Sequence, residues 1–135
     1  VRPEATDPET EIEYGDISSV SSEYGVEKTE TMRFEAAPSR ARRKVKSGDV
    51  IISTVRTYLK AIAPITDNVA HVIVSTGFAV IRPMDGFDSS YARYALHANY
   101  FVDQVIAKSV GVSYPAINAS VLRCCLRTII LIYMY

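Results

Sequence analysis

The stretch APSRARRKVKSGDVIISTVRTYLK (residues 37–60) places an apolar segment between two groups of basic side chains. Its centre, DVIISTV (residues 49–55), is rich in β-branched residues and follows a Ser-Gly-Asp turn, which is typical of a strand. We therefore predict a core strand over residues 49–55. Its packed side chains are predicted to be those of Val50, Ile51 and Ile52.

Further strands are expected on both sides of this one, over residues 12–20, 29–35, 59–65, 69–75 and 77–82. Residues 21–28 carry turn signals around Gly25, and residues 37–46 are expected to form a loop because Pro38 disfavours helix before it. The segments are short and closely spaced, which favours antiparallel or strongly curved pairing.

The apolar spacing becomes helical after residue 88, where Asp88 or Ser89 is expected to cap a helix. A break at residues 97–100 would divide this region into two short helices, with Asn99 as the second cap. Residues 111–118 are predicted to form a loop, and Asn118 to cap a helical turn that ends at Leu122. Strands followed by helices predict an α+β domain, with a curved, mostly antiparallel or mixed β core and a few short helices toward the C-terminal half.

Charge is unevenly distributed along a chain whose net charge is zero. Residues 1–35 hold ten acidic and three basic residues, a net charge of −7, whereas residues 36–60 hold seven basic residues and one acidic residue, a net charge of +6. A local positive field is what polyanion binding requires. The neutral total therefore does not argue against a nucleic-acid partner.

Cys124 and Cys125 are the only cysteines, and adjacent cysteines cannot cross-link a fold. We therefore expect a reducing, cytoplasmic environment. No signal-like segment opens the sequence, and its longest apolar run (residues 129–135) is shorter than a membrane span, so no membrane partner is expected.

Three sequence blocks occur in a particular order: APSRARR with GDVIISTVR (residues 37–43 and 48–56), STGFAVIRP (75–83) and GVSYPAINAS (111–120). Asp88-Ser89 and a Tyr-rich helical segment lie between the second and the third. In this order, over residues 12–122, the blocks resemble the DNA-specificity (S) subunits of type I restriction–modification systems. Several ordered blocks are more specific than any one motif.

The resemblance implies a fold like that of DNA methylase specificity domains. A full S subunit has two target-recognition domains separated by long helices, and each domain recognises one half of a bipartite site in double-stranded DNA. The implied partners are methyltransferase (modification) subunits and a restriction subunit. The S subunit is non-catalytic, so no enzyme activity and no cofactor are expected in this chain; S-adenosylmethionine would belong to the methyltransferase.

The sequence departs from the family pattern in two respects. Residues 1–122 resemble a single target-recognition domain, without a second domain or long spacer helices, as in a truncated or half-length subunit. Residues 123–135 are a divergent apolar tail that looks frameshifted or truncated, which puts assembly with the methyltransferase in doubt. We expect the tail either to add a last strand to the sheet or to expose an association-prone edge.

The resemblance and the charge pattern together predict a DNA-binding surface, with phosphate contacts for most of its basic residues. Its candidate residues are Arg40, Arg42, Arg43, Lys44, Lys46, Arg56, Tyr58, Lys60, Lys108, Ser113 and Tyr114. The predicted strand is expected to hold the two basic groups at its opposite ends. The alternatives are a solvated charged turn for the basic run, core packing for Tyr58 and a purely structural cap for Asn118.

Catalytic and metal sites find little support in the sequence. His71, expected in an apolar strand, and His97, expected in a helix, are interpreted as structural, and the cysteine pair lacks zinc-site spacing. Gly77 is expected to have a structural role. The alternative function is a protein-interaction or homodimerisation module that uses the acidic N-terminal third and the apolar tail; a hydrolase is a third and weaker possibility.

Overall fold

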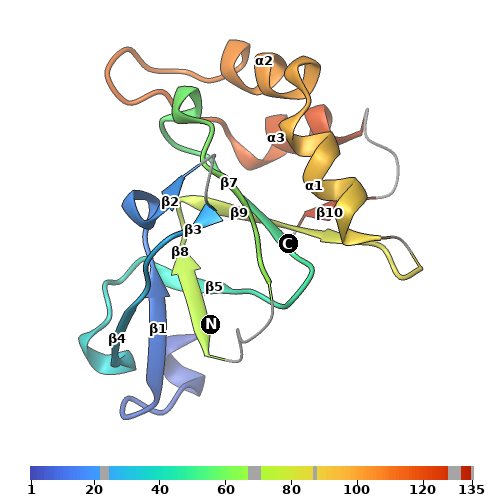
Figure 1. Cartoon of the computed structure of the whole chain (residues 1–135). Helices are drawn as coiled ribbons and strands as arrows, with labels where there is room; N and C mark the ends of the chain where they lie inside the picture. Colours follow the sequence, from blue (N-terminus) through green and yellow to red (C-terminus); the bar gives the residue numbers. More distant parts are fainter. Residues whose placement is uncertain (22–24, 67–70, 87, 128–131, 135) are drawn as a thin grey trace.

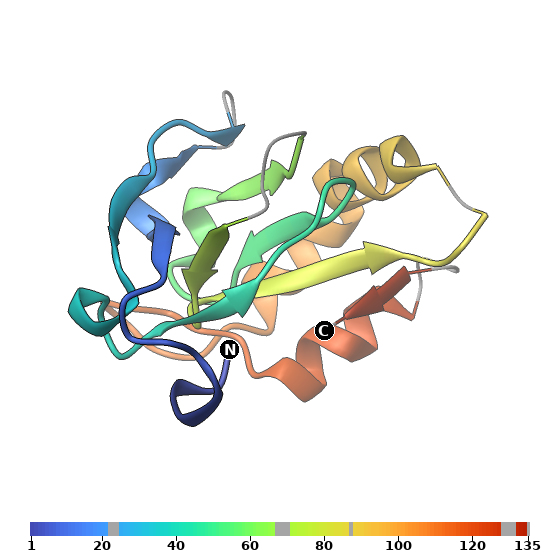
Figure 2. The same ribbon diagram turned by 90° about the horizontal axis from the view of Figure 1, so that it is seen from below.

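The chain folds in layers, with helices on one side of two stacked sheets (Figure 1 and, turned by 90°, Figure 2). The structure is a computed structural model that describes residues 1–21, 25–66, 71–86, 88–127 and 132–134. Within those residues there are two four-stranded sheets, a two-stranded hairpin and three α-helices. This arrangement confirms the predicted α+β class with a mixed β core and helices in the C-terminal half.

The first sheet, called the N-terminal sheet, has the strand order β4-β1-β8-β5. Its strands are β4 (Glu30–Arg33), β1 (Glu11–Gly15), β8 (Val72–Ser75) and β5 (Ala41–Lys44). β1 and β8 are parallel, and the other pairs are antiparallel. β5 is therefore an edge strand of this sheet.

The second sheet, called the central sheet, is antiparallel throughout and has the order β10-β9-β6-β7. Its strands are β10 (Ile132–Met134), β9 (Phe78–Pro83), β6 (Val50–Ser53) and β7 (Ile62–Pro64). The remaining short elements are β2 (Val20–Ser21), β3 (Gly25–Val26), η1 (Pro3–Ala5), η2 (Ile17–Ser19), η3 (Phe34–Ala36) and η4 (Thr57–Leu59).

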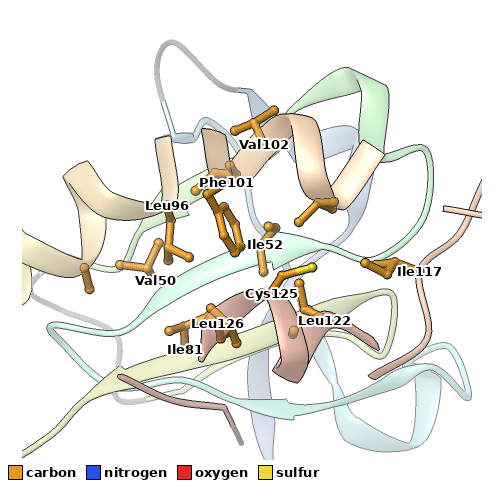
Figure 3. Packing of buried hydrophobic residues seen from close by; sticks show 14 residues of the cluster. Val50, Ile52, Ile81, Leu96, Phe101, Val102, Ile117, Leu122, Cys125 and Leu126 are labelled. Atoms are coloured by element: carbon orange, nitrogen blue, oxygen red, sulfur yellow. The ribbon is translucent and has the colours of Figure 1, made fainter. Parts of the chain in front are cut away.

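Both faces of the central sheet are buried. Val50 and Ile52 of β6 face the helices, whereas Ile51 faces the N-terminal sheet, as the alternation of a strand requires. Figure 3 shows Val50 and Ile52 beside Leu96 and Phe101. The prediction that residues 50–52 pack is confirmed, and burial on both faces explains why the apolar run has no polar alternation.

The helices begin at side-chain caps that the sequence partly predicts. Asp88 accepts a hydrogen bond from the Ser90 amide and caps α1 (Ser89–His97). Asn118 caps α3 (Ala119–Leu126) in the same way through the Ser120 amide. The predicted break is confirmed, but α2 (Asn99–Ala107) has Ala98 rather than Asn99 at its N-cap.

Several predicted strand boundaries are wrong. Residues 37–46 do not form a loop throughout, because residues 41–44 are β5. Residues 17–19 form a 3₁₀ turn within the strand expected over 12–20, the strand expected over 59–65 begins with the last residue of η4, and Arg33 is followed by η3. His71 lies in an exposed turn rather than in an apolar strand. Residues 22–24, 69 and 70 of the predicted turn and strand lie outside the described residues.

A β-bulge explains why β5 was not recognised in the sequence. The register between β5 and β8 shifts between Ala41 and Arg43. Ala41 packs on the outer face of the N-terminal sheet and Val45 on its inner face, although residues four apart in a regular strand face the same side. The bulge therefore disguises the strand period, while Arg42, Arg43 and Lys44 remain at the surface or half-buried.

The apolar tail joins the core where the structure describes it. α3 continues past Leu122, and Cys125 and Leu126 are buried among the helix-side core residues (Figure 3). Further on, β10 pairs with β9, which confirms that part of the tail adds a strand to the sheet. The proposed division at residue 122 stays a prediction, although α3 runs through it; residues 128–131 and 135 are outside the described residues.

A buried ion pair fixes the turn before β6. Asp49 is 1% exposed and accepts two hydrogen bonds of 2.7 Å from Nε and Nη2 of Arg82 on the neighbouring β9. The Lys46 amide donates to the same carboxylate. This pair could not be predicted from the sequence, because Asp49 and Arg82 are distant in the chain and meet only when β6 and β9 pair. In the part of the chain that is described, no helix has the length and apolar character to cross a membrane.

Candidate nucleic-acid interface

Two loops distant in sequence are joined by backbone hydrogen bonds at one end of the molecule. Residues 54–60 follow β6, and residues 108–117 connect α2 to α3. The Arg56 amide donates to the Pro115 carbonyl at 2.7 Å, and the Ile117 amide donates to the Thr54 carbonyl at 2.8 Å. We call the two segments together the double loop; Figure 1 shows them side by side, in green and orange.

The second segment of the double loop is closed on itself. The amides of Val110 and Ala116 each donate to the other residue's carbonyl at 2.9 Å. Gly111 has a φ of +120°, and a Cβ there would lie 3.0 Å from the Tyr114 carbonyl oxygen. Glycine is therefore required at this position by both backbone angle and space. Residues 110–116 form a short, closed loop.

Two side-chain contacts join the loops: Arg56 lies on the Tyr114 ring, and the hydroxyl oxygens of Thr57 and Ser109 are 2.7 Å apart. The Arg56 guanidinium carbon lies 4.6 Å from the centroid of the Tyr114 ring, which is cation–π geometry. Arg56 and Lys60 have left-handed backbone conformations, with φ of 48° and 52°. Such angles are unfavourable for residues other than glycine, and they often occur at functional sites.

The predicted residues of the double loop are exposed together. Tyr58 is 49% exposed and Tyr114 66% exposed, so the alternative that Tyr58 packs in the core is wrong. Arg56, Lys60, Lys108 and Ser113 are also exposed. Sequence reasoning missed Val110 and Val112, which are 79% and 103% exposed; two valines in a Gly-containing loop were the available signal.

The other basic residues lie along the edge strand β5. Arg43 and Lys44 are exposed, and their side chains make no hydrogen bond or ion pair within the described ranges. Arg42 is half-buried over the Phe34 ring. Cations on an edge strand also prevent pairing with another chain, so the charge of β5 has a structural use of its own.

Arg40 is held in a fixed orientation just before β5. Its Nε donates to the Tyr14 hydroxyl at 3.2 Å, and its Nη2 contacts an Asp16 carboxylate oxygen at 2.7 Å. The hydrogen bond to Tyr14, followed by the charge of Asp16, raises the pKa of Arg40 above its ordinary value. The guanidinium therefore stays charged, and it borders a pocket of about 460 Å³ that also includes Lys28.

The turn between β8 and β9 brings Arg40 and the double loop to the same end of the molecule. The Thr76 amide donates to the Arg40 carbonyl, and the Thr54 amide donates to the Gly77 carbonyl, both at 2.8 Å. Gly77 is needed for close approach, because a Cβ there would lie 2.6 Å from Ile17 Cδ1. The expectation that the two basic groups lie at opposite ends is therefore wrong for Arg40 and Arg56.

Lys46 is separated from this arrangement. It lies at the other end of β5, beside the Asp49 turn, and lines a pocket with Arg82 and Ser89. The structure thus brings Arg40 to the same end of the molecule as the predicted residues of the double loop, whereas Arg42, Arg43 and Lys44 lie along β5 and Lys46 lies beyond it. Asn118 is occupied as the cap of α3, in agreement with the structural alternative for it.

No catalytic or metal centre is found among the residues that the structure describes. His97 Nδ1 contacts the Arg93 carbonyl oxygen at 2.6 Å within α1, and His71 is in an exposed turn. No cluster of three or more His, Cys, Asp or Glu residues could hold a metal within these ranges. The predicted residues that are exposed at the double loop carry cationic groups, aromatic rings and hydroxyl groups.

Solved structures with the same fold identify the class of this domain. Seven chains of solved structures match it, although no family model matches the sequence and no curated protein matches it significantly. One, from a study of complex assembly and conformational transition of the type I R-M system, has 36% identity and a TM-score of 0.76. Another, the HsdS subunit from Thermoanaerobacter tengcongensis, has 36% identity and a TM-score of 0.74.

In both cases the match covers 85% of this chain and 30% of the other chain. The fold and the exposed double loop thus define a recognition-type α+β domain, of the class found in restriction–modification specificity components. The chain belongs to the specificity (S) subunit family of type I restriction–modification systems. Specificity subunits are non-catalytic, which confirms the expectation that this chain is not an enzyme.

Proposed function

We propose that this domain binds double-stranded DNA and recognises one half of a bipartite target for a type I restriction–modification complex. The observation that carries the proposal is the clustering of exposed cations with Tyr58 and Tyr114 at one end of a fold similar to that of specificity subunits. The DNA-facing surface would be the double loop together with Arg40, Arg42, Arg43 and Lys44.

Phosphate binding is the first task of this surface. Arg43, Lys44, Lys60 and Lys108 are exposed and have no intramolecular partner among the described residues, so contact with phosphate costs them no existing ion pair. Each such contact releases counterions from the DNA. Arg40 differs because Tyr14 and Asp16 orient it, which suits a directed contact to a guanine edge or a phosphate.

Salt-dependent binding tests the proposal. Fluorescence anisotropy with a random-sequence duplex should show binding at about 50 mM salt and a strong loss at about 200 mM. If five cations contact phosphates, the slope of log K against log salt is about −4.5, and affinity falls about 500-fold over that range. Absence of binding at the lower salt, or binding that salt does not weaken, would refute DNA binding by this surface.

A matched variant pair locates the surface. Charge reversal at Arg43 should remove much of the binding, whereas charge reversal at Arg93, an exposed cation on α1, changes the net charge equally and should leave binding nearly unchanged. Circular dichroism of each variant checks the fold. Equal losses for the two variants would indicate attraction by the overall charge rather than by a defined surface.

The partners of the domain follow from the same proposal. Methyltransferase and restriction subunits would assemble with a protein that contains this domain, and S-adenosylmethionine would bind to the methyltransferase rather than here. The complex would be cytoplasmic. The chain spans 30% of the length of the matched specificity-subunit chains, so these partners are proposals for the whole protein.

A second candidate function, homodimerisation or docking to a protein, rests on the outer face of the first two helices. Tyr91 and Tyr94 of α1 and Tyr100 of α2 are 48%, 74% and 52% exposed. Light scattering tests it: a dimer that persists after charge reversal at Arg42 and Arg43 and dissociates in Tyr94→Ser would support association through the tyrosines. A monomer at all concentrations would rule out homodimerisation.

A further inference from the structure

The tip of the double loop exposes apolar side chains that the fold does not use. Of the eight large apolar or aromatic residues that are exposed in the described part of the chain, five lie on these two loops: Tyr58, Leu59, Val110, Val112 and Tyr114. Val112 is 103% exposed, so it contacts essentially nothing else. Single exposed apolar residues are ordinary, but a group of five on adjoining loops indicates a contact surface.

The loop holds Val112 in a defined place. Its base is closed by the reciprocal hydrogen bonds between Val110 and Ala116, and the Arg56 amide ties Pro115 to the neighbouring loop. The side chain at position 112 therefore loses little conformational freedom on binding, which favours its use in recognition.

The charge around the tip selects the kind of partner. Arg56 lies over Tyr114, and Lys60 and Lys108 are exposed on the same two connecting segments. An apolar tip surrounded by cations fits the groove of a nucleic acid, whose rims are phosphates and whose floor is made of base edges. Residues 110–116 are a loop closed by one antiparallel bridge between Val110 and Ala116. The major groove is wide enough to admit elements as large as an α-helix or a two-stranded ribbon, so it can admit such a loop.

An isopropyl group has no hydrogen-bond donor or acceptor, so it distinguishes bases by apolar contact alone. The C5-methyl group of thymine is the apolar group on the base edges of the major groove. Resting on the DNA-binding role proposed above, we propose that Val112 contacts a pyrimidine C5-methyl group in the major groove and thereby specifies thymine at one position of the target. Ser113, exposed beside it, supplies a hydroxyl for hydrogen bonding to a neighbouring base edge.

Selection from a random duplex library followed by methyl removal tests this inference. Wild-type protein should enrich a sequence with a required thymine, and deoxyuridine at that position should lower its affinity about fourfold, the effect of one buried methyl-sized group. The Val112→Ala variant should bind the two duplexes equally. Tyr91→Ala, which truncates an exposed side chain on α1 outside the double loop, should retain the wild-type difference.

A second experiment distinguishes contact with the methyl group from contact with the rest of the base. Replacing that thymine by cytosine and then by 5-methylcytosine should restore part of the affinity for wild-type protein, but not for Val112→Ala. Because the side chain is fully exposed, the variant is expected to fold normally, and circular dichroism checks this.

The outcomes distinguish this inference from the function on which it rests. Absence of DNA binding at low salt overturns both. If methyl removal weakens DNA binding equally for wild type and Val112→Ala, or weakens neither, the proposed role of Val112 is overturned but the DNA-binding function is not. A DNA bend that disappears in Val112→Ala without any methyl dependence would overturn it in favour of a wedge inserted between base pairs.

Discussion

The Arg56 guanidinium lies 4.6 Å from the centroid of the Tyr114 ring and links two loops that are distant in sequence. The contact comes in addition to the hydrogen bond from the Arg56 amide to the Pro115 carbonyl, so backbone and side chain act at the same junction. Because the Tyr114 ring covers one face of the guanidinium, the cation is oriented before any ligand arrives. The first prediction concerns this orientation.

Tyr114→Ala should weaken DNA binding about two- to fivefold, since an exposed cation–π contact contributes about 0.5–1 kcal/mol. Tyr114→Phe keeps the ring and should bind like wild type if the ring acts only by stacking on Arg56. Anisotropy at one fixed salt concentration measures both variants. A Phe variant as weak as the Ala variant would show that the hydroxyl, rather than the stack, makes the contribution.

Arg43 on β5 and Lys46, two residues beyond the end of the strand, should differ in their effect on DNA. Arg43→Gln should reduce the magnitude of the salt slope by about one, as expected for the loss of one phosphate contact. Lys46→Gln has the same change in charge but lies beside the Asp49 turn, away from the double loop, and should leave the slope nearly unchanged. Equal slopes for the two variants would contradict the location given to the DNA-binding surface.

Lys60 allows backbone strain to be separated from charge. Its left-handed conformation costs about 1 kcal/mol in a residue with a Cβ, so Lys60→Gly should raise the free energy of unfolding unless the greater freedom of glycine in the unfolded chain offsets the gain. Lys60→Ala removes the same charge but keeps the strain. Urea unfolding should therefore rank Gly above Ala, while the two lose equal DNA affinity; the reverse stability order would argue against strain.

The buried ion pair between Asp49 and Arg82 should dominate local stability. Asp49→Ala leaves Arg82, whose side chain is 23% exposed, without its carboxylate and should lower the free energy of unfolding by about 3 kcal/mol. The control is Glu9→Ala, which breaks an ion pair to Arg33 whose side chains are 61% and 70% exposed and should change stability within measurement error. Similar urea midpoints for both variants would contradict this account.

Local sequence signals predicted the parts of the fold that depend on neighbouring residues. The β-branched run around Ile51 predicted a packed strand, and Asp88 and Asn118 predicted helix starts, because caps act within a few residues. The loop over residues 111–118 followed from its glycine and proline. The resemblance to S subunits supplied the family, which composition alone did not.

The remaining features depend on contacts across the chain. Strand β5 escaped recognition because its exposed edge carries charges and its bulge breaks the alternation between Ala41 and Val45. The pairing of Arg56 with Tyr114 required knowledge of how two loops meet. Cys125 and Leu126 looked like part of a divergent tail, but a helix turns both toward the core, which a comparison of sequence patterns could not show.

Main-chain hydrogen bonds hold much of the double loop, because the Arg56–Pro115, Thr54–Ile117 and Val110–Ala116 bonds all join peptide groups. Peptide groups are the same whatever side chain is attached, so Val112 and Ser113 can be exchanged without losing any of these bonds. The backbone that positions the loop and the side chains that would contact the target can therefore change independently. A domain built in this way is suited to acquiring a new target by a few surface substitutions, while its two buried sheet faces stay unaltered.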